Sequence, residues 1–351
     1  HGLDSNGQLY KINSFEFYRY EDIIKKEDDA GYDKTAFEKM LEIKGDSDHT
    51  KLIDMLTDLN DYSIGIEDVL KEHFDEENIV YWMAFQILMG NVDTQNRNVY
   101  LYSPLNSDIW YFIAWDNDGC LMRPEYELRN FSDQNSWEKG ISNYWGNILF
   151  QRCLKSRSFR EKLNDAILDL REYLNKDMLT SKIESYKNVL KPYLYLMPDA
   201  EYEPLTSEQY DQIAASLPDE IEKNYQLYLE SLETPMPFYI GVPTIDGDKL
   251  KFNWDVSYDL DAEDITYSVE VARDYLFQDV IYQNTTLTVP EAEMDLPKAG
   301  QYFVRVRATN TSGKTQDAFD YYVTDEGKYY GMRCFYITED STVEEDDYEE
   351  G

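Results

Sequence analysis

The sequence predicts an α+β protein in which a mostly helical domain with one small β-hairpin is followed by an all-β sandwich. Apolar residues recur with a helical period through most of the first 232 residues. At Pro235–Pro237 this pattern changes to short runs that alternate between apolar and polar residues, as antiparallel strands do. A length of 351 residues also favours two domains. We therefore expect domains at residues 1–232 and 235–326, and an acidic disordered tail at 339–351.

The helices of the first domain are predicted from periodicity and capping residues. Apolar residues between positions 52 and 59 fall on one face of a helix over Thr50–Asn60, which Asp48 or Thr50 could cap. Asp75, followed by two glutamates, predicts the start of a second helix that runs to about Gly90. Further amphipathic helices are expected within residues 148–194 and 207–232.

A β-hairpin is expected between these helical segments. Val99–Ser103 and Ile109–Trp115 are short β-rich runs, and a Pro/Asn/Ser/Asp cluster that favours a turn separates them. A polar loop flanks each end of the hairpin, Gly-Asn-Val-Asp-Thr-Gln-Asn-Arg-Asn at residues 90–98 and Trp-Asp-Asn-Asp-Gly at residues 115–119.

These two loops carry the residue pattern that points to chemistry. In protein kinases a catalytic-loop Asp is followed, after four intervening residues, by a metal-binding Asn, and a second Asp after a later strand binds metal again. Asp93, Asn98 and Asp116 reproduce this spacing. Spacing alone favours the simpler interpretation that they are turn residues, because Asp, Asn and Gly favour turns. A calcium loop does not fit, since Gly119 comes too early and the later bidentate Glu is missing.

Composition argues against nucleic acid as a partner. The 70 acidic and 33 basic residues give a formal charge of −37, which would repel the phosphate backbone of nucleic acids. An anionic nucleotide could bind only where a metal ion or a basic cluster reverses the field. The three cysteines suggest neither a disulfide framework nor a metal knuckle, and no apolar run is long enough to span a membrane.

Several segments of the first domain together resemble the CotH (spore-coat-protein-H-like) family of atypical protein kinases, over residues 7 to about 193. The segments are Gly7–Lys11 (Gly-Gln-Leu-Tyr-Lys), Phe74-Asp75, Asn98–Tyr102 (Asn-Val-Tyr-Leu-Tyr), Phe112–Asp118 (Phe-Ile-Ala-Trp-Asp-Asn-Asp), Asn147–Arg152 and Ser158–Arg160. In this family Asn replaces the His of conventional kinases at the position of Asn91.

The resemblance implies a kinase-like fold, corresponding to the C-terminal lobe, that transfers the γ-phosphate of ATP to Ser or Thr hydroxyls of surface or coat proteins, its own included. Asp93 would be the catalytic Asp, Asn98 and Asp116 would bind Mg²⁺ or Mn²⁺, and Asp118 would have a supporting or second metal role. An extracellular or cell-surface location is also implied. The alternative is a non-catalytic surface or wall-associated scaffold with a degenerate kinase-like core.

One departure from the family concerns the nucleotide. The N-terminal lobe, with the strands and basic residues that hold the phosphates, should precede Gly7, but only six residues do. Lys11 and Lys44 are expected to be a lobe-junction residue and a solvated surface charge. We therefore expect this chain alone to transfer little phosphate, and we leave the nucleotide-binding residues unassigned.

The second domain resembles a fibronectin type III module over residues 238–324. Trp254 is expected in the core, and Tyr302 would be the corner tyrosine of the fold. In the strand that follows, Tyr302, Val304 and Val306 should face inward and Phe303, Arg305 and Arg307 should face water. Such modules act as spacers or contact units, here with a protein or the cell wall.

Overall fold

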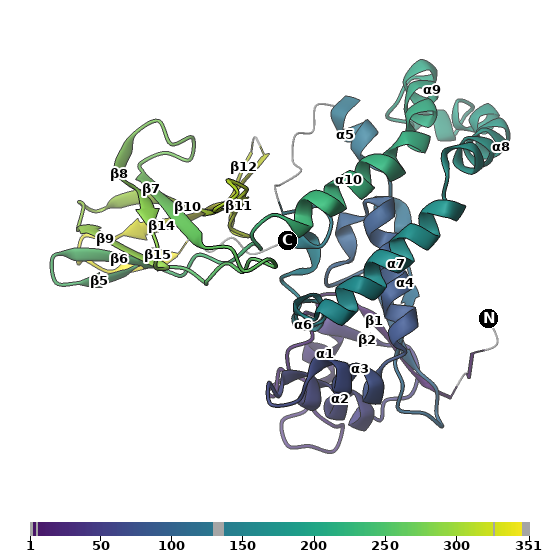
Figure 1. Ribbon diagram of the computed structural model, residues 1–351, viewed down its shortest axis with the longest axis horizontal. Helices are drawn as coiled ribbons and strands as arrows, with labels where there is room; N and C mark the ends of the chain where they lie inside the picture. Colours follow the sequence, from purple (N-terminus) through teal and green to yellow (C-terminus); the bar gives the residue numbers. More distant parts are fainter. Residues whose placement is uncertain (1–2, 5, 129–136, 326, 346–351) are drawn as a thin grey trace. The chain divides into compact units, whose positions relative to one another are not determined.

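The computed structural model describes residues 3–4, 6–128, 137–325 and 327–345, and the chain divides into two compact units. The first unit comprises residues 1–132 and 143–228, and the second comprises residues 133–142 and 229–351. The first is largely helical with one small sheet, and the second is rich in antiparallel sheets (Figure 1). The predicted α+β class is therefore confirmed.

Helices form in each segment where they were predicted, and unpredicted helices form at residues 34–40, 66–73 and 123–128. The helices are α1 (Lys34–Met40), α2 (Thr50–Asn60), α3 (Ile66–His73), α4 (Glu76–Met89), α5 (Arg123–Leu128), α6 (Ile148–Lys155), α7 (Arg157–Tyr173), α8 (Lys176–Leu194), α9 (Ser207–Ser216) and α10 (Glu220–Leu232). The division between the two units falls within α10. None of the helices among the described residues is long and apolar enough to cross a membrane.

Local capping explains where several helices begin. Asp75 caps α4 as predicted, since its Oδ1 accepts a 2.9 Å hydrogen bond from the Asn78 amide. Asn147 and Ser156 cap α6 and α7 in the same way. The cap of α2 differs from the prediction, because His49 occupies the position and Asp48 instead accepts from the backbone of Thr50.

One antiparallel sheet in the first unit carries the predicted hairpin. Its order is β2-β1-β3-β4, formed by β1 (Gln8–Ile12), β2 (Leu41–Ile43), β3 (Val99–Ser103) and β4 (Tyr111–Ala114). The central strand β1 pairs with β2 on one side and β3 on the other. The hairpin is thereby tied to residues about ninety positions earlier in the chain.

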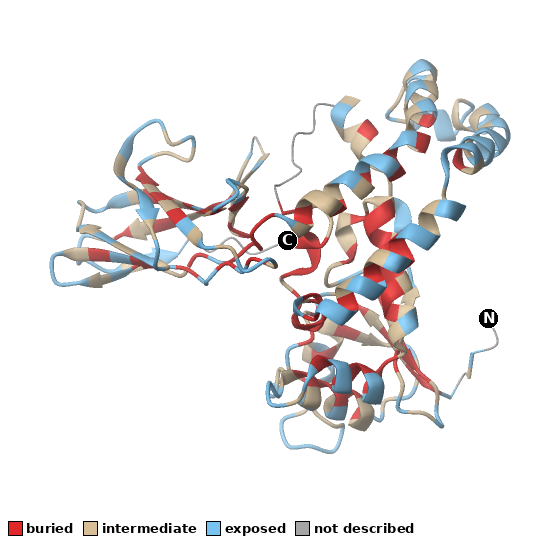
Figure 2. Ribbon diagram, viewed as in Figure 1, coloured by how far each residue is buried: buried red, intermediate tan, exposed pale blue. Residues whose placement is uncertain are grey.

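Helix α4 forms the centre of the first unit. It is apolar almost all round and packs against both α7 and β4. Figure 2 shows buried residues along most of its length. The aromatic ring of Trp82 stacks on Phe150 and contacts Phe112, which joins α4 to α6 and to the hairpin.

The described residues of the second unit form three antiparallel sheets. Their strands are β5 (Thr244–Asp246), β6 (Lys249–Asn253), β7 (Ile265–Ala272), β8 (Val280–Leu287), β9 (Glu291–Asp295), β10 (Gly300–Asn310), β11 (Thr315–Asp317), β12 (Tyr321–Thr324), β13 (Gly327–Tyr330), β14 (Met332–Ile337) and β15 (Val343–Glu345). The large sheet has the order β15-β14-β10-β7-β8 with β11 beside β10, and the others are β5-β6-β9 and β12-β13.

The core of the second unit lies between the large sheet and the three-stranded sheet. Buried residues of β6 pack with those of β7, β10 and β14 in one hydrophobic cluster. Trp254 belongs to this cluster, as predicted. Tyr302 is buried as well, and its hydroxyl donates a 2.7 Å hydrogen bond to the carbonyl of Lys298. This is the backbone contact expected of a corner tyrosine.

Two features of the second unit differ from the sequence prediction. Phe303 does not face water: it is buried in a separate cluster with Met332 and Cys334. The strands also continue past residue 326, where the domain was expected to end, because β14 pairs along β10 and β15 pairs with β14. β15 lies inside the predicted tail, and residues 346–351 of that tail lie outside the described residues.

Candidate active site

The first predicted loop begins where α4 ends. Gly90 has a left-handed backbone (φ 61°), and its amide donates to the last carbonyls of the helix. A Cβ at Gly90 would lie 2.6 Å from Nδ2 of Asn224, so both conformation and space require glycine here. The loop then runs through the 3₁₀ turn Val92–Thr94 into β3.

Asp93 and Asn98 lie side by side in this loop. The Asn98 carboxamide donates a 2.6 Å hydrogen bond to Oδ2 of Asp93. Arg97 Nε lies 2.6 Å from Oδ1, so both oxygens of the Asp93 carboxylate are engaged. The side chains of Arg97 and Asp93 are 56% and 40% exposed, respectively. A pair this exposed contributes little stability and can open readily.

The second predicted loop follows β4. Asp116 has a left-handed backbone (φ 54°) and opens the 3₁₀ turn Asn117–Gly119. Asn98, at the other end of the hairpin, is also left-handed (φ 58°). Such conformations are unfavourable for residues with a Cβ and tend to concentrate at functional sites. Asp116 and Asp118 are both exposed.

The two loops meet through amide side chains. Asn91 and Asn117 approach to 3.5 Å, and the buried Gln86 hydrogen-bonds to both. Gly119 packs so closely that a Cβ on it would lie 2.7 Å from Oδ1 of Asn91 and 3.6 Å from Cβ of Asp93. The turn that Asp116 opens therefore passes directly beside Asp93.

Side chains from residues 143–147 hold the first loop from behind. Asn143 donates to the carbonyl of Val92 (3.2 Å), and Asn147 donates to that of Gln95 (2.9 Å). The hydroxyl of Thr94 lies 3.1 Å from that of the buried Tyr144. Burial raises the pKa of Tyr144, so this hydroxyl stays neutral and serves as a hydrogen-bonding group.

The N-terminal segment holds the same loop from the other side. The carbonyl of Asn96 accepts a 2.8 Å hydrogen bond from the amide of Phe15. The Asn96 side chain donates to the carboxylate of Glu16 (2.6 Å), which also accepts from the Tyr20 hydroxyl (2.5 Å). The loop that carries Asp93 therefore has little freedom to move.

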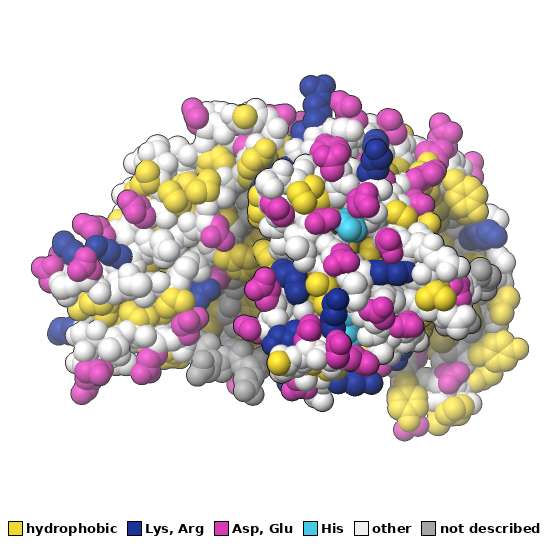
Figure 3. All heavy atoms as spheres, turned by 90° about the horizontal axis from the view of Figure 1, so that it is seen from below, with side chains coloured by type: hydrophobic (Ala, Val, Ile, Leu, Met, Phe, Trp, Pro, Cys, Tyr) yellow, Lys and Arg dark blue, Asp and Glu magenta, His cyan; other side chains and the backbone are white. Residues whose placement is uncertain are grey.

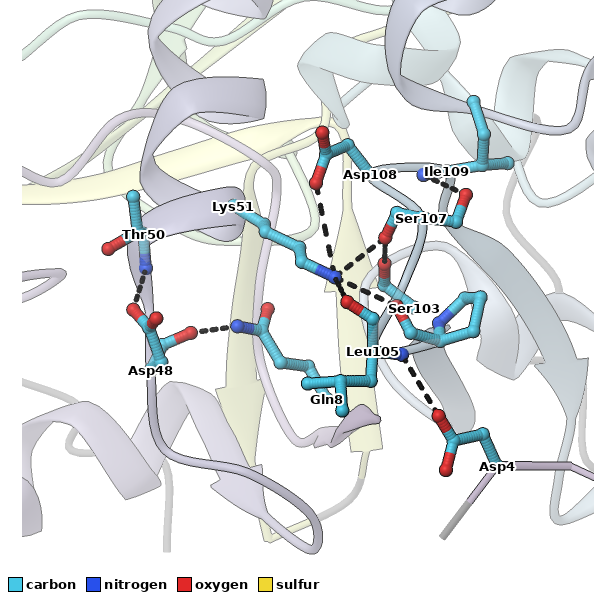
Figure 4. Close-up of polar contacts among 11 residues, drawn as sticks. Asp4, Gln8, Asp48, Thr50, Lys51, Ser103, Leu105, Ser107, Asp108 and Ile109 are labelled. Atoms are coloured by element: carbon cyan, nitrogen blue, oxygen red, sulfur yellow. Dashed lines mark hydrogen bonds and ion pairs between the residues drawn. The ribbon is translucent and has the colours of Figure 1, made fainter. Parts of the chain in front are cut away.

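The turn of the hairpin is fixed by a lysine. Lys51 on α2 points into this turn (Figure 4), and its ammonium donates to the carbonyls of Pro104 (2.8 Å), Leu105 (3.1 Å) and Ser107 (2.6 Å). The carboxylate of Asp108 lies 3.9 Å away. Both ends of the hairpin are therefore anchored, one by Lys51 and the other by the loops that carry Asp93 and Asp116.

The donor set suits a hard divalent cation by its chemistry. Asp93, Asn98 and Asp116 all offer oxygen, which Mg²⁺ and Mn²⁺ prefer. Among the described residues, however, no group of three or more His, Cys, Asp or Glu side chains is arranged to hold a metal ion. Nor does a hydrogen bond or ion pair between described residues join Asp116 or Asp118 to Asp93. The structure brings Asp93 and Asn98 together and places the Asp116 turn beside them.

Cys120 cannot supply a reactive thiolate to this site. Burial, with the nearby charge of Asp118, raises the pKa of the Cys120 thiol to about 12, so it is protonated at neutral pH.

Lys44, close in sequence to β2, pairs with Glu42 at the surface, in agreement with the expected solvated charge. Acidic side chains are spread over the face shown in Figure 3, with Lys and Arg interspersed among them.

Several residues of the site were not predicted from the sequence. Gln86, Tyr144 and Asn147 contact the two loops from outside them, and Asn117 lies in the second loop but had no predicted role. Gln86 did carry a signal, because it is the one polar side chain in the apolar run from Ile79 to Met89 apart from the tyrosine hydroxyl. A buried amide in such a run needs partners.

Comparison with known proteins identifies the family. No curated protein matches the chain. Among solved structures, the surface layer protein SbsC (domains 1–6) aligns with 94% of this chain and 41% of its own, at 11% identity. Its TM-score of 0.16 is too low to argue a shared fold. The family described as CotH kinase protein matches residues 1–228, well over half of the sequence. The chain therefore belongs to the CotH family.

Proposed function

We propose that this protein is a CotH-type protein kinase that transfers the γ-phosphate of ATP to Ser or Thr hydroxyls of surface or coat proteins, its own included. Family membership supports the reaction class. The observation that carries the proposal is the placement of Asp93 against Asn98, with the Asp116 turn packed on the same loop. An extracellular or cell-surface location is part of the proposal.

Asp93 is the residue that would orient the acceptor hydroxyl. In the transfer step the hydroxyl oxygen forms a bond to the γ-phosphorus, the bond from that phosphorus to the ADP oxygen breaks, and the hydroxyl proton passes to the Asp93 carboxylate. The hydrogen bond from Asn98 fixes the carboxylate plane for this task. Arg97 must release Oδ1, which its exposure allows.

Asn98 and Asp116 are the proposed metal ligands, and Asp118 has a supporting or second metal role. A bound Mg²⁺ or Mn²⁺ would neutralise charge on the phosphates. The Asn98 amide nitrogen is directed at Asp93, which leaves its carboxamide oxygen to serve as a ligand. Asp116 and Asp118 are exposed on the adjacent turn, which packs beside Asp93 through Gly119.

The test is radiolabelled phosphate transfer by the protein produced from its complete reading frame. Asp93→Ala and Asp116→Ala should each lower kcat by on the order of 100-fold or more, because the first removes the acceptor of the hydroxyl proton and the second removes a proposed metal ligand. Asp22→Ala, which changes an exposed carboxylate of the first unit, is the control and should keep full activity. Equal transfer by all four proteins would show that this site is not the kinase site.

The same experiment tests a second function. This function is favoured by the fact that both carboxylate oxygens of Asp93 already have partners in the structure. Under this alternative the chain is a non-catalytic surface or wall-associated scaffold. The second unit would then be the contact module, with a fibronectin type III-like fold supported by its sandwich core and the Tyr302 contact. A protein that binds its surface partner yet transfers no phosphate under any metal condition would favour the scaffold.

A further inference from the structure

Gln86 is a buried polar residue with a partner on each of the two loops. It lies in the last turn of α4 and has no exposed surface. Its Oε1 accepts a 3.0 Å hydrogen bond from Nδ2 of Asn91, and its Nε2 donates a 3.1 Å hydrogen bond to Oδ1 of Asn117. One carboxamide thus satisfies a donor from the first loop and an acceptor from the second.

The three amides form a closed triangle. Nδ2 of Asn91 also lies 3.5 Å from Oδ1 of Asn117, and Oδ1 of Asn91 accepts from the backbone amide of Asp93 (3.3 Å). Beside the triangle, the amide of Leu121 donates to the carbonyl of Met89 (2.8 Å). The end of α4 is therefore a common support for both loops, and the Gln86 side chain hydrogen-bonds to a residue of each.

We propose that Gln86 is a positioning residue that fixes the separation between Asp93 and the Asp116 turn. This inference rests on the proposed function, since it assigns a role in the same site. A buried carboxamide without hydrogen-bond partners is unfavourable in free energy. Movement of either loop away from Gln86 would leave one of its polar atoms unpaired, so both loops are held in place. Gln86 touches neither loop's carboxylates, so its effect must pass through Asn91 and Asn117.

A positioning role predicts a specific kinetic effect. Loss of Gln86 leaves Asp93, Asn98 and Asp116 present but lets the two loops shift relative to one another. Misplacement of this kind lowers kcat by on the order of 10- to 100-fold. The KM for ATP should stay within about twofold, because no proposed nucleotide contact is removed. A merely structural residue would instead lower the amount of folded enzyme and leave turnover per folded molecule unchanged.

The experiment compares Gln86→Leu with Met83→Ala in the protein from the complete reading frame. Met83 is fully buried on the same helix, so its truncation destabilises the fold without touching either loop's hydrogen bonds. Phosphate transfer per folded molecule and thermal unfolding are measured for both. Asn117→Ala serves as a second variant, because Asn117 is exposed and its truncation should leave the fold intact.

Hydrogen–deuterium exchange provides a readout that does not depend on activity. Gln86→Leu and Asn117→Ala should both increase exchange in peptides covering residues 91–98 and 116–121, and Met83→Ala should not do so selectively. Combining Gln86→Leu with Asn117→Ala should cost no more activity than the larger single change. If exchange in the two loops is unchanged, or if Met83→Ala lowers kcat as much, the positioning role is wrong. If the wild type transfers no phosphate, the proposed function fails, while the exchange measurement still decides whether Gln86 couples the loops.

Discussion

The carboxamide nitrogen of Asn98 lies 2.6 Å from Oδ2 of Asp93, although Asn98 must adopt a left-handed backbone (φ 58°) to place it there. Left-handed backbone costs a residue with a Cβ on the order of 1 kcal/mol. Asn tolerates this conformation better than most residues. The unfavourable backbone conformation of Asn98 therefore accompanies a hydrogen bond that fixes the orientation of the Asp93 carboxylate.

This relationship predicts different outcomes for two substitutions that both remove the amide. Asn98→Ala keeps a Cβ in the left-handed region, and Asn98→Gly does not. We expect Asn98→Ala to unfold with a free energy about 1 kcal/mol lower than Asn98→Gly. Phosphate transfer should fall to the same low level in both, since neither can hold Asp93. Denaturant unfolding and a phosphate-transfer assay on the same samples measure both effects. Equal stability of the two variants would show that the left-handed backbone at residue 98 is not strained.

Gly119 should be intolerant of a single added methyl group. A Cβ there would lie 2.7 Å from Oδ1 of Asn91, so Gly119→Ala forces the two loops apart and should cost about 1–3 kcal/mol. Asn91→Ala removes the atom that clashes. The double variant should therefore be more stable than the sum of the two single effects predicts. Strict additivity in denaturant unfolding would show that the close approach does not constrain the loops.

The local secondary structure around this site could be predicted from the sequence. Asp75 and Gly90 mark the ends of α4 by capping and by a left-handed turn, and both ends lie where periodicity placed them. The hairpin was likewise predicted from its turn residues and β-rich runs. Each of these signals acts within a few residues, which is why one sequence can reveal it.

The surroundings of the loops could not be predicted in this way. Asn147 reaches Gln95 and Tyr144 reaches Thr94 across about fifty residues of chain, and the N-terminal segment pairs with β3 over a longer separation still. No periodicity or turn rule connects such positions. The burial of Phe303 has the same cause, since the residues that cover it come from β12, β13, β14 and the segment between β7 and β8.

Lys51 should contribute measurably to stability although it is a charged residue near the surface. Its ammonium donates to three carbonyls of the hairpin turn, and its side chain is only 19% exposed. Lys51→Met should lower the free energy of unfolding by about 2 kcal/mol. Lys44→Met is the matched control, because Lys44 forms an exposed pair with Glu42 and its loss should change stability much less. Comparable losses in denaturant unfolding would refute the anchoring role.

The stability of the first unit should depend on pH through His49. This ring has no exposed surface and stacks on Phe37, and its nitrogens lie 2.7 Å and 3.3 Å from the hydroxyls of Tyr10 and Tyr32. Burial lowers the pKa of His49 below its ordinary value, although Glu27 and other nearby carboxylates oppose the shift. The folded ring is therefore neutral at pH values at which the unfolded chain binds a proton.

The sign follows from proton linkage. Below about pH 6.5 the unfolded state gains a proton at His49 that the folded state lacks, so stability falls as the pH falls, by at most about 1.4 kcal/mol per pH unit. Denaturant unfolding between pH 7.5 and pH 5.5, a range set by the ordinary His value of about 6.5, measures this slope. His49→Gln should flatten the slope, because it replaces the buried ring with a side chain that does not titrate. A slope in His49→Gln equal to that of the wild type would show that the buried ring is not its source.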